Sequence, residues 1–360
     1  MSVDVERPVN SSEKDITDDE AKLYDRQIRL WGVASQKRLR KANVVCFGLS
    51  GLASEIIKNI VLAGINSLTI VDDVKISEDD TLNNIFTCHE VGKYRGEIAM
   101  VNIKALNPMV QVNAMYWSLK EKIANKNSTE VNELLKSADC VVVTNSDPDT
   151  MINLNDLCAS SARPITFFAA CDWGFYGFSF TDLGRNYKYI TQEVIQNEID
   201  TEKPSPKKQK TEEIQKSYVE RQLDFVPLRT ALSVKSGKAG IGITKRTSPV
   251  LALTHILFEF HRKTGRFPTP ETRQQDMETL SSLKESVLNE LELPNTALKE
   301  LEDENCFENV FGRFSPISAI IGGVLGQDII RAITNQDAPI RNFFLFDGMK
   351  CQGSVESIGK

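Results

Sequence analysis

The sequence lacks three features that would assign it to a large protein class. Its 7 cysteines form no CxxC pair, it has only 3 histidines, and no apolar run approaches the ~18 residues that a membrane helix needs. The N-terminus, MSVDVERPVNSSEKD, has no apolar signal core. We therefore expect a soluble, non-secreted protein without a metal site, whose thiols are free and mostly buried.

A large excess of one charge is also missing. The 43 basic and 49 acidic residues give a net charge of −6, which argues against a general nucleic-acid binder. The charge is uneven, because residues 26–41 hold six bases and no acid, whereas residues 271–304 hold ten acids and three bases. The sequence leaves open whether the acidic stretch contacts a partner or faces water.

The first half of the chain alternates short β-branched runs with helix-length segments. Thr17 and Glu20 form a capping-box pair, which predicts a helix that ends at Gly32, after a disordered N-terminus at residues 1–16. This alternation is typical of an α/β fold with a parallel sheet. We expect strands at residues 43–48, 67–72, 111–117, 139–144 and 164–170.

The alternation is lost after a strand pair expected around GFYGFSFTDLG. Residues 200–216 have almost no apolar content and predict a flexible charged loop. Its Pro206–Lys210 core fits a nuclear import signal or a solvated lysine run. Residues 249–304 are expected to be helical, with His255 and His261 on an amphipathic core helix.

Alternation returns near the C-terminus, where small residues on one helix suit close packing and RNFFLFDG forms a last strand. With 360 residues, the chain has room for two domains or for one domain with an insertion. The order of segments favours the insertion. We expect an α/β domain at residues 17–172 plus 306–360, interrupted by a largely helical insertion at 173–305.

Two segments are candidates for chemistry. The loop from Gly48 to Glu55 follows a strand and opens a helix, and Asp72 ends the next strand, as in a dinucleotide-binding motif. Ser50, however, stands where a glycine would admit a pyrophosphate. Upstream, YDRQIRLWG places Arg26 and Arg29 on one helix face, where a guanidinium can bind a phosphate or simply face water.

These two segments, with Leu106-Asn107-Pro108 and the closing NFFLFDGMK, resemble the activating enzymes of ubiquitin-like proteins, and among them the smaller subunits of SUMO-activating heterodimers. The resemblance extends from about Asp18 to Lys360. It implies a Rossmann-like, ThiF/MoeB-like adenylation fold. It also implies that the modifier's C-terminus is adenylated with ATP and Mg²⁺ and then forms a thioester with a cysteine of a larger catalytic subunit, in the nucleus and partly in the cytoplasm.

The nucleotide-binding motifs of the family are altered here. Ser50 and Ala53 replace two of four loop glycines, and Asn84 replaces a phosphate-binding arginine. Arg95 replaces a lysine, and Ser146 replaces the metal-binding aspartate, with Asp147 one residue away. The resemblance thus implies a pseudo-adenylation half that binds no ATP or metal itself. Its vestigial site comprises Gly48, Ser50, Gly51, Asp72, Asn84, Arg95 and Ser146.

Arg26 matches the family arginine that crosses the dimer interface to the ATP phosphates of the partner, so the resemblance implies a catalytic role in trans. No cysteine has the setting of the thioester nucleophile, and Cys171 comes nearest. SUMO is expected to be engaged through the complex, with no membrane or nucleic-acid partner.

Other functions remain open at this point. A homodimeric adenylyltransferase of the bacterial sulfur-carrier type would need the metal aspartate and CxxC pairs, and an NAD-dependent oxidoreductase would need the full glycine loop. A nuclear adaptor would rest on Pro206–Lys210 alone. The sequence does not identify the modifier, and it does not exclude that Asp147 restores some nucleotide binding.

Overall fold

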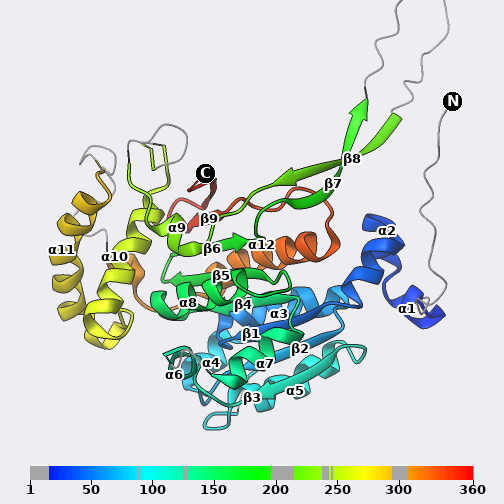
Figure 1. Ribbon diagram of the computed structural model, residues 1–360. Coiled ribbons are helices and arrows are strands. Elements are labelled where there is room, and N and C mark those ends of the chain that lie inside the picture. The colour runs from blue at the N-terminus through cyan, green and yellow to red at the C-terminus, as the bar shows by residue number, and fades with distance from the viewer. Residues whose placement is uncertain are drawn as a thin grey trace, which may run out of the picture.

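The computed structural model describes residues 16–87, 90–124, 128–195, 215–236, 243–244, 246–293 and 307–359. In these residues the main sheet contains β1 (Asn43–Phe47), β2 (Ser67–Val71), β3 (Gln111–Met115), β4 (Cys140–Thr144), β5 (Thr166–Trp173), β6 (Tyr176–Asp182), β9 (Phe343–Asp347) and β10 (Gln352–Glu356). Their order is β10-β9-β6-β5-β4-β1-β2-β3 (Figure 1).

The half of the sheet from β3 to β5 is parallel, and the half from β5 to β10 is antiparallel. One face is covered by α3 (Gly51–Ala63), α5 (Arg95–Leu106) and α12 (Ser315–Thr334). The other face is covered by α6 (Leu119–Ala124), α7 (Thr129–Ser137), α8 (Pro148–Ala159), α10 (Pro249–Thr264) and α11 (Arg273–Glu290). The central strands β1, β4, β5, β6 and β9 are buried on both faces because helices flank them, whereas the edge strands β3 and β10 are largely exposed.

The predicted α/β fold is confirmed, and its five expected strands form the parallel half of a mixed sheet, within three residues of their expected bounds. The expected strand pair is the β5–β6 hairpin, which turns at Gly174 with a φ of 52°. Strand β6 lies inside residues 173–305 but pairs with β5 and β9 in the main sheet. The sheet therefore continues past residue 172, and the division of the chain into domains stays a prediction.

The N-terminal segment forms two helices where the sequence predicted one. α1 (Asp18–Leu23) begins with the predicted capping box between Thr17 and Glu20, and α2 (Asp25–Leu39) follows directly. Tyr24 separates them because its ring is buried against Gly64. Gly32 interrupts α2 at a φ of 83°, as expected of a helix stop, but helical residues continue after it.

A two-stranded ribbon of β7 (Tyr187–Ile195) and β8 (Gln215–Leu223) was not predicted. It projects away from the main sheet (Figure 1). Gln215 and Lys216, expected in the charged loop, belong to β8. The rest of that loop, with Pro206–Lys210, lies outside the described residues, as do most of the expected disordered N-terminus and the end of the acidic stretch.

The remaining α-helices of the described chain are α4 (Glu78–Asn83) and α9 (Leu228–Leu232), and two short 3₁₀ helices span Pro270–Thr272 and Glu308–Val310. Helix α12 is long and apolar enough to cross a membrane, with a mean hydropathy of 1.4, but 61% of this segment is buried inside the protein. It packs on α3 through small residues, since a Cβ at Gly322 would lie 2.7 Å from Cβ of Glu55. The glycines of α12 thus pack closely against another helix of the same chain, as predicted.

Candidate functional site

The loop between β1 and α3 has the strand–loop–helix arrangement that the sequence predicted. Gly48 has a φ of +82°, and a Cβ there would lie 2.8 Å from the carbonyl oxygen of Thr144, so only glycine fits. Ser50 is the N-cap of α3, and its Oγ accepts a hydrogen bond from the amide of Ala53 at 3.3 Å. The side chain that replaces a family glycine is therefore used to begin the helix.

A chain of hydrogen bonds also includes the Ser50 hydroxyl. Nδ2 of Asn145 lies 3.0 Å from Ser50 Oγ and 2.8 Å from Oδ1 of Asp172. The other oxygen of Asp172 accepts a hydrogen bond from the Ser318 hydroxyl on α12. Ser50, Asp172 and Ser318 are buried and Asn145 is half-buried, and this network joins the loop to the end of β4, to β5 and to α12.

Asp72 directs its carboxylate to the backbone of the same loop. Its Oδ2 accepts from the amide of Leu49 at 2.7 Å, and its Oδ1 accepts from the amide of Val74 at 3.0 Å. Burial raises the pKa of Asp72, and the guanidinium of Arg95 and the two amides act in the opposite direction. Asp72, which stands where a dinucleotide-binding motif has its ribose-binding acid, thus uses its carboxylate to hold the backbone of its own chain.

The end of α4 is packed against the start of α3. A Cβ at Gly51 would lie 2.5 Å from the carbonyl oxygen of Asn83, and the Nδ2 of Asn84 donates to the carbonyl of Leu49 at 2.8 Å. Ser77 and Asp80 cap the beginning of α4 reciprocally. The backbone of Asn83 and the Asn84 amide therefore occupy the space next to the first turn of α3, where anions bind in related loops.

Arg95 completes this cluster. Its guanidinium lies 2.7 Å from Oδ1 of Asp80 and 3.8 Å from Oδ2 of Asp72, and its side chain is 13% exposed. The positive charge of Arg95 is therefore neutralised by two carboxylates of the same chain. We call Gly48–Gly51, Asp72, Asp80, Asn83, Asn84 and Arg95 together the self-filled loop.

The structure brings six of the seven predicted vestigial residues into the self-filled loop or its hydrogen bonds. Ser146 lies beside Asn145 and is half-buried. Asp147, the alternative metal ligand, is the N-cap of α8, and its Oδ1 accepts from the amide of Thr150 at 2.9 Å. Among the described residues, no three His, Cys, Asp or Glu side chains are grouped to hold a metal ion.

Five residues that contact the loop were not predicted from the sequence: Asp80, Asn83, Asn145, Asp172 and Ser318. The Ser77–Asp80 capping box was a readable local signal for the start of α4. Asp172 and Ser318 are far from the loop in the sequence, and their hydrogen bonds form only because the sheet and α12 pack together. Local residue spacing therefore gives no sign of them.

Arg26 lies away from this loop, on α2, and its side chain is exposed. The opposite side of α2 is fixed by Tyr24, whose hydroxyl accepts a hydrogen bond from Asn107 at 2.9 Å, and by Gln27, which donates to the carbonyl of Leu62 at 3.0 Å. Arg29 pairs with Asp25 at 3.0 Å, whereas Arg26 forms no ion pair with any described residue. Its charge remains available to a partner.

Of the five cysteines that the structure describes, four are buried and only Cys351 is exposed. Cys171, the nearest candidate for a nucleophile, lies within β5, and burial followed by the nearby Asp172 raises the pKa of its thiol. A raised pKa makes a thiol less reactive. Cys88 and Cys306 lie outside the described residues.

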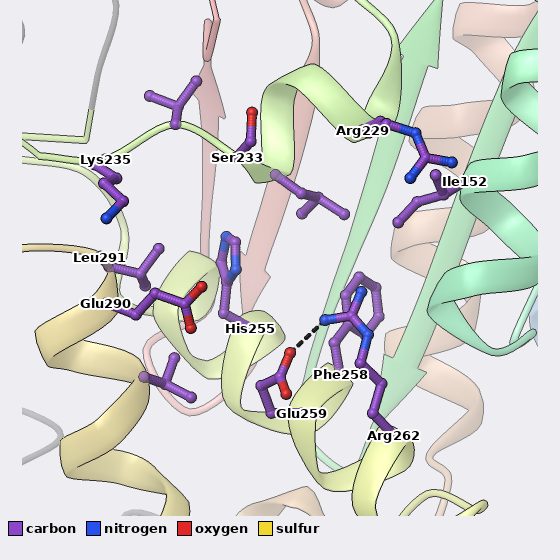
Figure 2. Close-up of a pocket in the computed structure, with 13 residues that line it drawn as sticks. Ile152, Arg229, Ser233, Lys235, His255, Phe258, Glu259, Arg262, Glu290 and Leu291 are labelled. Atoms are coloured by element: carbon purple, nitrogen blue, oxygen red, sulfur yellow. Dashed lines mark hydrogen bonds and ion pairs between the residues drawn. The ribbon is translucent and has the colours of Figure 1, made fainter.

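A cavity of about 360 Å³ lies between α8, α9, α10 and α11 and is separate from the self-filled loop. Figure 2 shows His255 on α10 among the lining side chains, with Glu259 paired to Arg262 nearby. Burial, then the charge of Arg262, lowers the pKa of His255 to about 4. His255 lies within α10, as predicted for a residue of an amphipathic helix.

Comparison with known proteins places this geometry in a family. The model of the ThiF family matches residues 24–359. The chain is 32% identical over 349 residues to the SUMO-activating enzyme subunit 1 of Rattus norvegicus, covering 96% of both chains. It is similarly related to that of Danio rerio, at 33% over 347 residues and 95% of both chains, and to that of Homo sapiens, at 32% over 349 residues and 96% of both.

Solved structures share the fold. A crystal structure of PaaA matches with a TM-score of 0.54 at 13% identity, over 98% of this chain and 78% of that one. E. coli MccB with succinimide matches with a TM-score of 0.51 at 13% identity, over 94% of this chain and 72% of that one. At such low identity these two likenesses concern the fold alone.

Proposed function

The chain belongs to the ThiF family and, within it, to the family of SUMO-activating enzyme subunit 1, and from this premise we propose that it is the smaller subunit of a SUMO-activating heterodimer. In this role it supports the ATP-dependent adenylation of the SUMO C-terminus, the first step of sumoylation. A larger catalytic subunit contributes the nucleotide site and the cysteine that forms the thioester.

The observation that supports the proposal most is that Arg26 is exposed and without an ion-pair partner among the described residues, whereas the positive charge of the self-filled loop, Arg95, is already paired. Arg26 is exposed on a helix whose other side is fixed to the protein, and it has no ion-pair partner among the described residues. A guanidinium stays protonated at any physiological pH and can bind phosphate oxygens bidentately. In the heterodimer, Arg26 stabilises negative charge on the nucleotide phosphates held by the larger subunit.

The residues of this chain's own loop do not fit ATP and Mg²⁺. Asn83 reaches within 2.5 Å of where a Cβ at Gly51 would stand, and Arg95 is paired with Asp80 at 2.7 Å. A triphosphate would have to displace the end of α4 and break that ion pair. We therefore assign ATP and Mg²⁺ to the larger subunit and a pseudo-adenylation role to this half.

ATP–pyrophosphate exchange in the presence of SUMO tests the proposal. We expect no exchange by the chain alone, exchange with the larger subunit, and a loss of about 10²- to 10³-fold with Arg26→Ala, since one donor to developing charge typically has that effect. Arg29→Ala is the matched control, because Arg29 is exposed on the same helix but paired with Asp25.

The outcomes separate the parts of the proposal. Robust exchange by the chain alone would contradict the pseudo-adenylation role. Exchange that needs the partner but is the same for Arg26→Ala and Arg29→Ala would contradict the role of Arg26 and leave the heterodimer intact.

We also propose a nuclear location, with some protein in the cytoplasm, on the basis of Pro206–Lys210 in the sequence. A fluorescent fusion in which Lys207, Lys208 and Lys210 are replaced by alanine should lose nuclear enrichment. A fusion that stays nuclear would show that this segment is not the import signal.

A further inference from the structure

Three consecutive carbonyl groups at the C-terminal end of α3 accept hydrogen bonds from side-chain amides. The last four carbonyls of an α-helix have no partner within the helix, so their partners come from elsewhere. The pairs are Gln27 with Leu62 at 3.0 Å, Gln36 with Ala63 at 2.9 Å and Asn107 with Val61 at 2.7 Å. We call Gln27, Gln36 and Asn107 the amide cluster. Two of its members lie on α2, so the cluster joins α2 to the end of α3.

Gln27 is the member of the amide cluster that lies next to Arg26. Both residues precede Gly32, which interrupts α2 with a φ of 83°, whereas the other glutamine of the cluster follows it. Asn107 acts on the same part of the chain as Gln27, because its Nδ2 also donates to the hydroxyl of Tyr24, the N-cap of α2, at 2.9 Å. The position of Arg26 therefore depends on contacts made before the break in the helix.

Helix α3 is a rigid support for these contacts. Most of its 13 residues are buried, and Ser50 caps its N-terminus. It packs closely on α12, where a Cβ at Gly326 would lie 2.8 Å from Cβ of Asn59. Side chains packed at interior density have little room to move. The end of α3 therefore stays in place relative to the sheet, and so does a side chain that is bonded to it.

The Gln27 side chain contributes through its N–H donor. Its Oε1 is buried and has no hydrogen-bond partner among the described residues. Its Nε2 donates to a carbonyl at a helix C-terminus, where the backbone carries partial negative charge that favours a donor. An apolar side chain of the same length would leave the carbonyl of Leu62 without this donor and α2 without this attachment to α3.

This inference rests on the proposed role of Arg26. We propose that Gln27 is a positioning residue for the adenylation reaction, supported by Gln36 and Asn107. Its hydrogen bond to Leu62 holds the first part of α2 on α3, so that the guanidinium of Arg26 meets the nucleotide phosphates at a fixed place. A misplacement of about 1 Å can lower a rate by about 10²-fold. The amide thus contributes to the rate through Arg26 and not by contact with the substrate.

Gln27→Met tests this role, because methionine keeps the length of glutamine and removes the donor without adding charge. ATP–pyrophosphate exchange is measured on the full heterodimer with SUMO, at saturating larger subunit, so that a change in affinity between the subunits does not enter the rate. We expect a rate about tenfold below wild type, which is a smaller loss than with Arg26→Ala.

Gln222→Met is the matched control. Gln222 is exposed on β8, and its Nε2 donates to Oδ1 of Asn186 at 2.6 Å, so the same substitution again removes one amide hydrogen bond. It should leave the exchange rate within about twofold of wild type. Thermal melting of the isolated chain should show both variants folded, since Gln27 is half-buried and loses a single hydrogen bond.

The effect of Gln27→Met is then measured again in the Arg26→Ala background. Without the guanidinium there is nothing left to position, so the double variant should match Arg26→Ala within about twofold. A residue with a merely structural role would instead lower the rate by the same factor in both backgrounds.

A rate for Gln27→Met within about twofold of wild type, or an equal loss in both backgrounds, would overturn the positioning role and leave the role of Arg26 intact. A wild-type rate for Arg26→Ala would instead overturn the proposed role of Arg26, and with it the inference that rests on it.

Discussion

A single methyl group at Gly51 tests whether α4 really closes the self-filled loop. In Gly51→Ala the new Cβ would lie 2.5 Å from the carbonyl oxygen and 3.1 Å from the carbonyl carbon of Asn83. Both atoms are backbone, so no side-chain rotation relieves the contact. The variant can fold only if the end of α4 moves away from the first turn of α3.

The expected size of the effect follows from overpacking. Inserting a methyl group into a well-packed site typically costs about 1–3 kcal/mol. Gly323→Ala is the control, because a Cβ at Gly323 meets nothing within 4 Å and the residue lies inside α12. There, alanine should stabilise the helix by up to about 1 kcal/mol. The two glycine-to-alanine changes should therefore shift the free energy of unfolding in opposite directions.

Thermal and urea unfolding of the isolated chain measure these shifts. At roughly 1–1.5 °C per kcal/mol for a chain of 360 residues, Gly51→Ala should lower the Tm by about 1–4 °C and Gly323→Ala should raise it by about 1 °C. Hydrogen exchange at the backbone N–H of Asn84, which donates to the carbonyl of Asp80, should become faster in Gly51→Ala and not in Gly323→Ala. A Gly51→Ala variant as stable as wild type would refute the packing of α4 on the loop, and with it the reason that ATP does not fit there.

Other predictions concern individual side chains. Iodoacetamide on the native chain, followed by peptide mass mapping, should label Cys351 and spare Cys171, because only the first of these thiols is exposed; equal labelling would contradict the burial. Burial raises the pKa of Asp328 to about 6. The folded state therefore holds the extra proton between about pH 4 and 6, and the free energy of unfolding should fall as the pH rises through that window. Asp328→Asn should flatten this slope in urea unfolding. Tyr24→Phe removes the hydrogen bond from Asn107 and should cost about 1 kcal/mol in the same assay; no loss would mean that the bond contributes nothing.

The parallel half of the sheet was predictable because β1, β2 and β4 are short β-branched runs and all five of its strands alternate with helix-length segments, a pattern that local spacing encodes. The ribbon of β7 and β8 was missed, although YKYITQEVI is rich in β-formers, because charged residues interrupt its apolar pattern. The break at Tyr24 was missed for a different reason. The helical periodicity runs through this residue, and only the tertiary packing of its ring on Gly64 ends the helix.

At the site, the sequence predicted which side chains had changed but not what they do now. Asn84 was interpreted as a lost positive charge, and the structure adds that its amide bonds to the carbonyl of Leu49. Arg95 was interpreted as a retained charge, and the structure pairs it with Asp80. Both contacts join residues distant in the sequence, and their partners follow from the packing of α4 on α3.

The self-filled loop has a consequence for how the subunit responds to its surroundings. A ligand that dissociates stabilises its protein by an amount that grows with ligand concentration. The groups that fill this loop belong to the chain, so they stay bound at any nucleotide concentration. The folded subunit should then keep the same stability when ATP is depleted as when it is abundant. In the proposed heterodimer, any dependence on the energy state of the cell would then arise in the larger subunit alone.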